Sequence, residues 1–181
     1  MDTLYVVSKP DFVKTDLQWL TTIRAKRAGN FGPPQFTLVF PGAQLEPREF
    51  AAFVASRAEG VRRIRFCLRS AVVVPEPIFG RFHVFLVPDE GFGAIVRLHD
   101  RLHAGPLEAC LRPDMPYLPH LTIATDSDYA ASRKIAAEIN ALELSICGEI
   151  DTLLIERRTG DVVRVHSEVP LARAGWLGLR P

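Results

Sequence analysis

Polar residues alternate with apolar ones in two short segments that otherwise have the composition of buried strands. The segments are Gln35-Phe36-Thr37-Leu38 and Pro119-His120-Leu121-Thr122-Ile123. Because successive side chains of a strand point to opposite faces, Gln35 and Thr37 share one face, as do His120 and Thr122. The apolar residues of both segments, and Phe40 beyond the first, are expected to point into the core. The pattern predicts two strands that each present a hydrogen-bonding pair, and the second pair contains a histidine.

The elements that follow the two segments also repeat. Each segment precedes a turn, an amphipathic helix, a long strand, a second turn and a further strand. The helices are expected around 50–54 and 135–142, and the strand pairs at 61–74 with 81–87 and at 144–157 with 162–169. Two units of strand, helix, strand, strand, starting at residues 35 and 120, indicate a duplication. The predicted fold class is α+β, bilobal, with antiparallel-rich sheets around a central cleft.

We expect one domain over residues 1–181. The lobe with the first segment is predicted at about 30–90 and the lobe with the second at about 116–171. Upstream of them we expect a strand at 3–8 and a helix that begins at Asp11. A helix over 91–103 is predicted to bridge the two units, and 105–117 is predicted to be a loop.

Composition fits this expectation. With 48% hydrophobic and 24% charged residues, the chain resembles a folded globular domain and not a disordered one. A net charge of +1 gives no general attraction for polyanions, so no long nucleic acid partner is expected. Eighteen arginines against four lysines would suit phosphate recognition, although an arginine-favouring genome explains the same bias.

Cysteine usage and hydropathy bear on the compartment. Cys67, Cys110 and Cys147 are widely spaced in apolar contexts and are expected to be buried thiols, not disulfide partners or zinc ligands. No apolar run approaches the ~20 residues of a membrane span, and the N-terminus has no signal-peptide pattern. We therefore expect a cytoplasmic monomer without a membrane partner.

The paired segments, their spacing and the Pro-Tyr-x-Pro-His-x-Thr context at 116–122 resemble the 2H phosphoesterases, the superfamily of 2′-5′ RNA ligases and 2′,3′-cyclic phosphodiesterases. In that family each lobe supplies a His-x-Thr-x motif to a central cleft. The resemblance implies that His120, Thr122 and Thr37 are catalytic, and that no metal or other cofactor is needed. Gln35 stands where the first motif has its histidine. It is expected to bind substrate, together with Tyr117, Arg81 and His83.

The chemistry of the family explains why two histidines are normally present. One takes a proton from water and the other protonates the departing ribose oxygen, which imidazole can do near neutral pH. Gln35 can form hydrogen bonds but cannot exchange a proton. The predicted activity is therefore hydrolysis or ligation at a 2′,3′-cyclic or 2′-5′ phosphodiester of a small nucleotide or RNA end, impaired by Gln35. The alternative is a non-catalytic nucleotide-binding or regulatory protein on the same scaffold.

Three other histidines have alternative interpretations. His99 and His103 have the i, i+4 spacing of a helical metal pair, but the glutamate of the zinc-protease motif and a third ligand are lacking, so no metal site is expected. His83 follows Arg81 on a predicted strand and faces either the cleft or the core.

Overall fold

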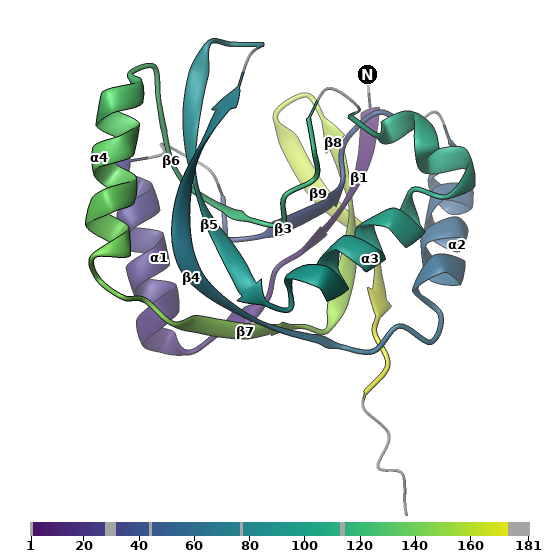
Figure 1. The fold of residues 1–181 in the computed structure, drawn as a ribbon. Helices are drawn as coiled ribbons and strands as arrows, with labels where there is room; N and C mark the ends of the chain where they lie inside the picture. The colour runs from purple at the N-terminus through teal and green to yellow at the C-terminus, as the bar shows by residue number, and fades with distance from the viewer. Residues whose placement is uncertain (1, 28–31, 44, 77, 113–114, 174–181) are drawn as a thin grey trace, which may run out of the picture.

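Two antiparallel sheets form the framework of the computed structural model, which describes residues 2–27, 32–43, 45–76, 78–112 and 115–173 (Figure 1). One sheet has the strand order β3-β1-β8-β9 and the other has the order β2-β7-β4-β5-β6. The strands are β1 (Asp2–Ser8), β2 (Asp11–Phe12), β3 (Phe36–Val39), β4 (Ile64–Glu76), β5 (Arg81–Glu90), β6 (Leu121–Asp126), β7 (Ile146–Ile150), β8 (Thr152–Thr159) and β9 (Val162–Pro170). The α+β prediction with antiparallel sheets is confirmed.

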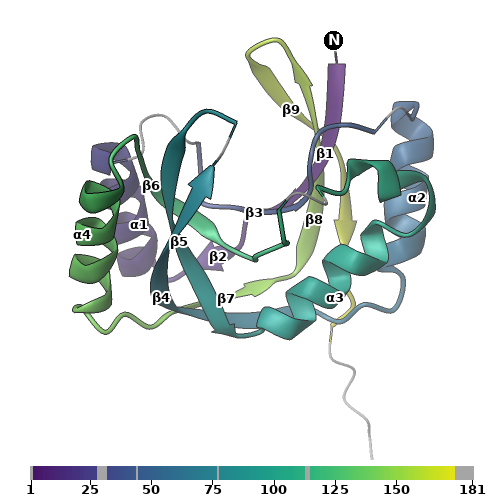
Figure 2. The same cartoon turned by 45° about the horizontal axis from the view of Figure 1, so that its top comes forward.

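Helices pack against both sheets. They are α1 (Lys14–Arg27), α2 (Pro47–Ala58), α3 (Phe92–Leu102) and α4 (Tyr129–Asn140). Helices α1 and α4 pack on the sheet that contains β6, whereas α2 packs on β9 and α3 packs on β3 (Figure 2). None of the helices in the described part of the chain is long and apolar enough to cross a membrane.

Local sequence signals explain two helix starts. Asp128 accepts a hydrogen bond from the backbone N–H of Ala130 at 2.8 Å and so caps α4. Gly91 precedes α3 with a φ of 80°, and a Cβ atom there would lie 2.3 Å from the carbonyl oxygen of Arg65 on β4. Only glycine permits this left-handed turn against the strand, so Gly91 fixes where α3 leaves the sheet.

Two expected elements differ in detail. The helix predicted from Asp11 begins at Lys14, because Asp11 and Phe12 pair with Glu149 and Gly148 of β7 as the short strand β2. The predicted loop over 105–117 contains a 3₁₀ helix, η1 (Gly105–Cys110).

The strand predicted over 144–157 is wrong as a single element. It is divided at Asp151 into β7, which pairs with β4, and β8, which pairs with β1 in the other sheet. An apolar run shows that a segment is buried but does not show that its partner sheet changes midway. The chain passes between the sheets here, and the backbone N–H of Leu171 bonds to the carbonyl of Asp151 at 2.7 Å.

The two sheets exchange strands between the repeated units. Strand β3 of the first unit lies in the sheet of β8 and β9, and β6 of the second unit lies in the sheet of β4 and β5. The ranges 30–90 and 116–171 therefore describe repeats along the chain, and each repeat contributes strands to both sheets. Strands β3 and β6 are edge strands of their sheets.

Each of these edge strands carries a bulge at the same place in its repeat. Val6 and Val7 of β1 pair with Val39 and Thr37, which leaves Leu38 without a partner residue. Val84 and Phe85 of β5 pair with Ala124 and Thr122, which leaves Ile123 without one. Leu38 and Ile123 are 85 positions apart, like the start of the two segments. The duplication thus extends to an irregularity of the backbone.

The bulges reverse the alternation of faces. Leu38 with Val39, and Ile123 with Ala124, are consecutive pairs of buried residues, at 0–1% exposure. Phe40 was expected to point into the core. Because of the bulge it lines the cleft described below instead.

The cysteine prediction is wrong for two of the three residues. Cys67 of β4 lies directly opposite Cys147 of β7 in the antiparallel register, and the two form a disulfide. Their separation of 80 residues hid this pairing, since only the sheet register brings them together. Cys110 is a buried free thiol, as expected, and burial raises its pKa. The compartment inference drawn from the cysteines therefore loses its basis.

Candidate active site

A cleft of about 810 Å³ lies where the edges of the two sheets meet. Strands β3, β5 and β6, helices α1 and α3 and the segment before β6 all contribute to its wall. The residues expected from the sequence to form a site line it together: Gln35, Thr37, Arg81, His83, Tyr117, His120 and Thr122. The structure thus brings residues from both repeats to one concave surface.

His120 precedes β6, and one ring nitrogen is fixed by the backbone. Its Nδ1 lies 2.6 Å from the carbonyl oxygen of Leu118. Because a carbonyl only accepts, Nδ1 carries the hydrogen and donates it. In neutral His120 the Nε2 atom then holds a lone pair. Nε2 has no hydrogen-bond partner among the described residues and is not one of their buried unpartnered atoms, so it is open to the cleft.

The surroundings of the His120 ring favour its neutral form. Its ring stacks on Phe85 of β5, with centroids 3.5 Å apart and planes at 15°. Burial lowers the pKa of His120 to about 4, the hydrogen bond to Leu118 opposes this shift, and the charge of His83 adds to it. At neutral pH the residue is therefore an uncharged acceptor, suited to take a proton.

His83 lies on the same sheet as His120. Its Nδ1 atom is 2.8 Å from the hydroxyl of Thr125, and its ring is nearly parallel to Phe85, with centroids 5.4 Å apart. The rings of His83, Phe85 and His120 therefore form one stack along β5 and the start of β6. Burial lowers the pKa of His83, partly opposed by Glu76. His83 faces the cleft, on the same side as His120 and not across from it.

The carbonyl of each motif threonine is held by a residue from outside its sheet. The Tyr117 hydroxyl donates to the carbonyl of Thr37 at 3.1 Å, and Nε of Arg24 donates to the carbonyl of Thr122 at 2.8 Å. Arg24 also donates to the carbonyl of Gly32 at 2.9 Å, just before the first motif. These hydrogen bonds reach β3 and β6, the edge strands of their sheets. They fix the two motifs relative to each other.

Several cleft residues were missed by the sequence prediction. Arg24 is one turn after Leu20 in α1, and it is only 6% exposed. Burial lowers its pKa. Thr125 enters the cleft because of the bulge at Ile123, which no side-chain pattern indicates. His99 and Asp100 of α3 also line the cleft, although the His99/His103 spacing was considered only for metal binding.

The charge of the cleft suits an anion. Arg24, Arg81 and Arg112 line it, against Glu76 and Asp100. Guanidinium groups and threonine hydroxyls are common donors to phosphate. Within the described residues no group of three His, Cys, Asp or Glu side chains is placed to hold a metal ion.

This fold and cleft define a protein of the 2H phosphoesterase class, with two sheets that each bring one motif strand to a shared site. Residues 14–162 match the family model of the 2′-5′ RNA ligase superfamily. The chain therefore belongs to the 2′-5′ RNA ligase superfamily, and the resemblance noted in the sequence is confirmed.

Solved structures show the same fold at low sequence identity. E. coli LigT, in complex with 3′-AMP, superposes with a TM-score of 0.62 at 11% identity, covering 94% of this chain and 98% of LigT. Usb1 from Kluyveromyces marxianus superposes with a TM-score of 0.55 at 10% identity, covering 93% of this chain and 98% of Usb1. Its complex with uridine monophosphate has a TM-score of 0.55 at 12% identity, covering 94% of this chain and 97% of that one. No curated protein matched in the sequence comparison.

Proposed function

We propose that this protein is a phosphodiesterase of the 2H type. Its substrate is a 2′,3′-cyclic or 2′-5′ phosphodiester in a small nucleotide or at an RNA end. The observation that carries the proposal is the meeting of His120, Thr122 and Thr37 in one cleft. The family supports it, as do the 3′-AMP bound to E. coli LigT and the uridine monophosphate bound to Usb1.

Each residue has a role in this proposal. His120 takes the proton of the attacking water at Nε2, since Nδ1 is committed to Leu118. The hydroxyls of Thr37 and Thr122 hold the non-bridging phosphate oxygens and stabilise the charge that develops on them. Gln35, Tyr117, Arg81 and His83 contact the rest of the nucleotide. These steps are proton transfer and positioning, so they require no metal.

The size of the cleft favours a short ligand. About 810 Å³ lies in the range of small-molecule sites, roughly 300–1,000 Å³. A nucleotide or the last residues of an RNA fit such a volume, whereas a long strand would need an extended basic track.

The glutamine at residue 35 favours a second candidate function, nucleotide binding without turnover. Glutamine replaces the first histidine of the family pattern, and His83 lies on the same side as His120, so neither residue provides a proton donor across the cleft. A nucleotide-binding or regulatory protein that does not turn over its ligand would tolerate both features.

A substrate panel tests the proposal. Purified protein is incubated with the four nucleoside 2′,3′-cyclic phosphates, with 2′-5′-linked dinucleotides, and with cyclic-phosphate RNA plus a 5′-hydroxyl RNA to detect ligation. We expect turnover that His120→Gln lowers by about 10² to 10⁴, while His166→Gln, on an exposed histidine of β9, leaves it unchanged. Binding of 3′-AMP without turnover of any substrate would favour the nucleotide-binding alternative. Absence of both would refute the site.

A further inference from the structure

The imidazole of His99 lies in the wall of the cleft, on the side of the first motif. Helix α3 packs on β3, the strand that carries Thr37, and both His99 and Asp100 line the cleft. The His99 ring stacks on Tyr117, with centroids 3.7 Å apart and planes at 8°, and the Tyr117 hydroxyl bonds to the carbonyl of Thr37. One ring therefore connects His99 to the first motif.

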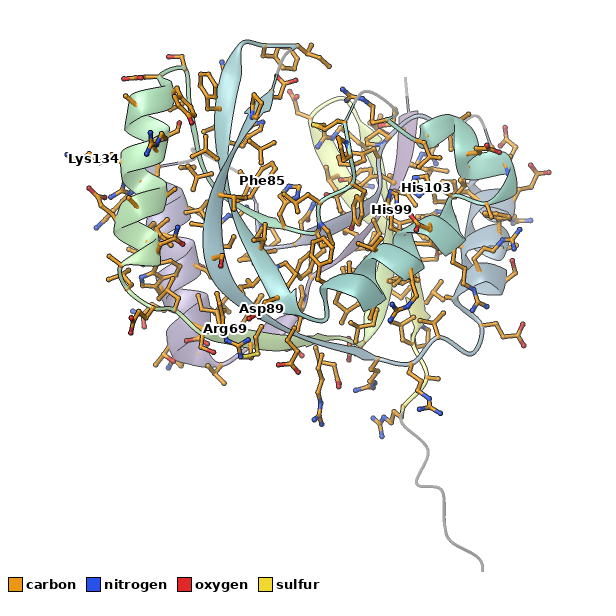
Figure 3. All side chains as sticks on the ribbon, in the orientation of Figure 1. Arg69, Phe85, Asp89, His99, His103 and Lys134 are labelled. Carbon is orange, nitrogen blue, oxygen red and sulfur yellow. A yellow bond between two sulfur atoms is a disulfide. The ribbon has the colours of Figure 1, made fainter. Side chains whose placement is uncertain are left out.

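His99 and the stack that holds His120 lie on different sides of the cleft. Figure 3 places Phe85 on the β4–β5 side of the central space and His99 on the α3 side. His120 stacks on Phe85, so it belongs to the first of these sides. Among the described cleft-lining residues, His83, His99 and His120 are the histidines, and only His99 comes from a helix, α3, which packs on β3 and also on β5 and β4.

A carboxylate fixes the ring nitrogens of His99. Its Nδ1 lies 3.0 Å from Oδ1 of Asp100, whose side chain is 67% exposed. The carboxylate accepts the Nδ1 hydrogen and leaves Nε2 as the second position for a proton. Nε2 has no hydrogen-bond partner in the described part of the chain and is not buried without one, unlike Nε2 of His103. The arrangement is a histidine oriented by an aspartate, with one nitrogen free to act.

We infer that His99 is the second proton-transfer group of this site and acts as the general acid across the cleft from His120, in the role that Gln35 cannot perform. The inference rests on the proposed phosphodiesterase activity. It gives a chain with only one intact His-x-Thr-x motif a second group for the proposed turnover.

The proton balance of the step is complete. As the water oxygen forms its bond to phosphorus, one water proton passes to Nε2 of neutral His120. The bond from phosphorus to one ribose oxygen breaks, and that oxygen receives the proton of Nε2 from the His99 imidazolium. The product is a phosphomonoester beside a free hydroxyl. Solvent then removes the proton from His120 and returns one to His99.

Several groups surround the His99 ring. Asp100 and His103 lie beside it on α3, Tyr117 lies against its ring, and Arg24 and Arg112 line the same cleft.

The test compares variants of the full chain with adenosine 2′,3′-cyclic phosphate as substrate and 3′-AMP as the binding probe. His99→Phe keeps a ring to stack on Tyr117 but has no proton to give. We expect its kcat to fall by about 100-fold or more, while the Kd for 3′-AMP changes little. His166→Gln, on an exposed histidine of β9 that does not line the cleft, is the control and should retain the wild-type kcat.

Two further variants separate catalysis from structure. Asp100→Ala, at an exposed side chain, should lower kcat while the Kd for 3′-AMP changes little, since Nδ1 of His99 loses the carboxylate that orients its ring. Adding Gln35→His to His99→Phe should restore turnover, because a histidine at residue 35 again provides an acid from the β3 side.

The outcomes distinguish this inference from the proposed function. A wild type that is active, with His99→Phe as active as His166→Gln, overturns the role of His99 and leaves the function intact. An unchanged kcat in Asp100→Ala, or no recovery in the double variant, also overturns it. A wild type that binds 3′-AMP but turns over no substrate overturns both.

Discussion

Protonation of His120 should destabilise the fold in acid. The size of this loss in unfolding free energy follows from the environment of the ring. In the unfolded chain the pKa of a histidine is near 6.5, whereas burial against Phe85 lowers the pKa of folded His120 to about 4. Between these values the unfolded chain binds a proton that the folded chain does not. The contribution of neutral His120 to stability is therefore fully present above pH 6.5 and is lost as the pH falls toward 4.

The expected magnitude is up to about 2 kcal/mol between pH 7.5 and pH 5, from the difference in proton binding of one histidine. It is measured as the free energy of urea unfolding at both pH values, followed by circular dichroism, for wild type and His120→Gln. Glutamine does not titrate, so the wild type should lose up to about 2 kcal/mol more than the variant on acidification.

Other titrating groups cancel in this comparison, since His83 and His103 are present in both proteins. The exposed His166 provides the control, because His166→Gln should show the same pH dependence as wild type. Equal losses in wild type and His120→Gln would refute the reasoning, since His120 would then be hydrated as well in the folded state as in the unfolded one.

Three further predictions concern the contacts that hold the cleft. Tyr117→Phe should lower the unfolding free energy by about 1 kcal/mol, because the hydrogen bond to the carbonyl of Thr37 is lost. Tyr129→Phe, at an exposed tyrosine of α4, should have no effect. Equal urea midpoints for the two variants would contradict this prediction. Arg24→Met should cost roughly 2–4 kcal/mol, because the carbonyls of Thr122 and Gly32 lose a charged donor, whereas Arg133→Met, at an exposed site of α4, should cost almost nothing in the same measurement. In a Cys110→Ser background, reduction of the Cys67–Cys147 disulfide should lower stability by up to about 4 kcal/mol, given its 80-residue separation; an unchanged unfolding curve after reduction would show that the bond does not restrict the unfolded chain.

The sequence by itself determined the elements whose signals are local. Alternation in 35–38 and 119–123 identified both motif strands, and the spacing of apolar residues identified α2, α3 and α4. The repeat of element types indicated two related halves, and the motif itself indicated the family and the polar residues of the cleft. These inferences succeed because side-chain period and turn residues depend on neighbours in the chain.

Only the tertiary structure decided which strands are neighbours. The exchange of β3 and β6 between sheets, the division of 144–157 at Asp151 and the pairing of Cys67 with Cys147 all depend on long-range register, which no local pattern encodes. The bulges at Leu38 and Ile123 turned Phe40 and Thr125 toward the cleft against the expected alternation. Packing of α3 on β3 gave His99 a place beside the first motif, which its sequence spacing to His103 had concealed.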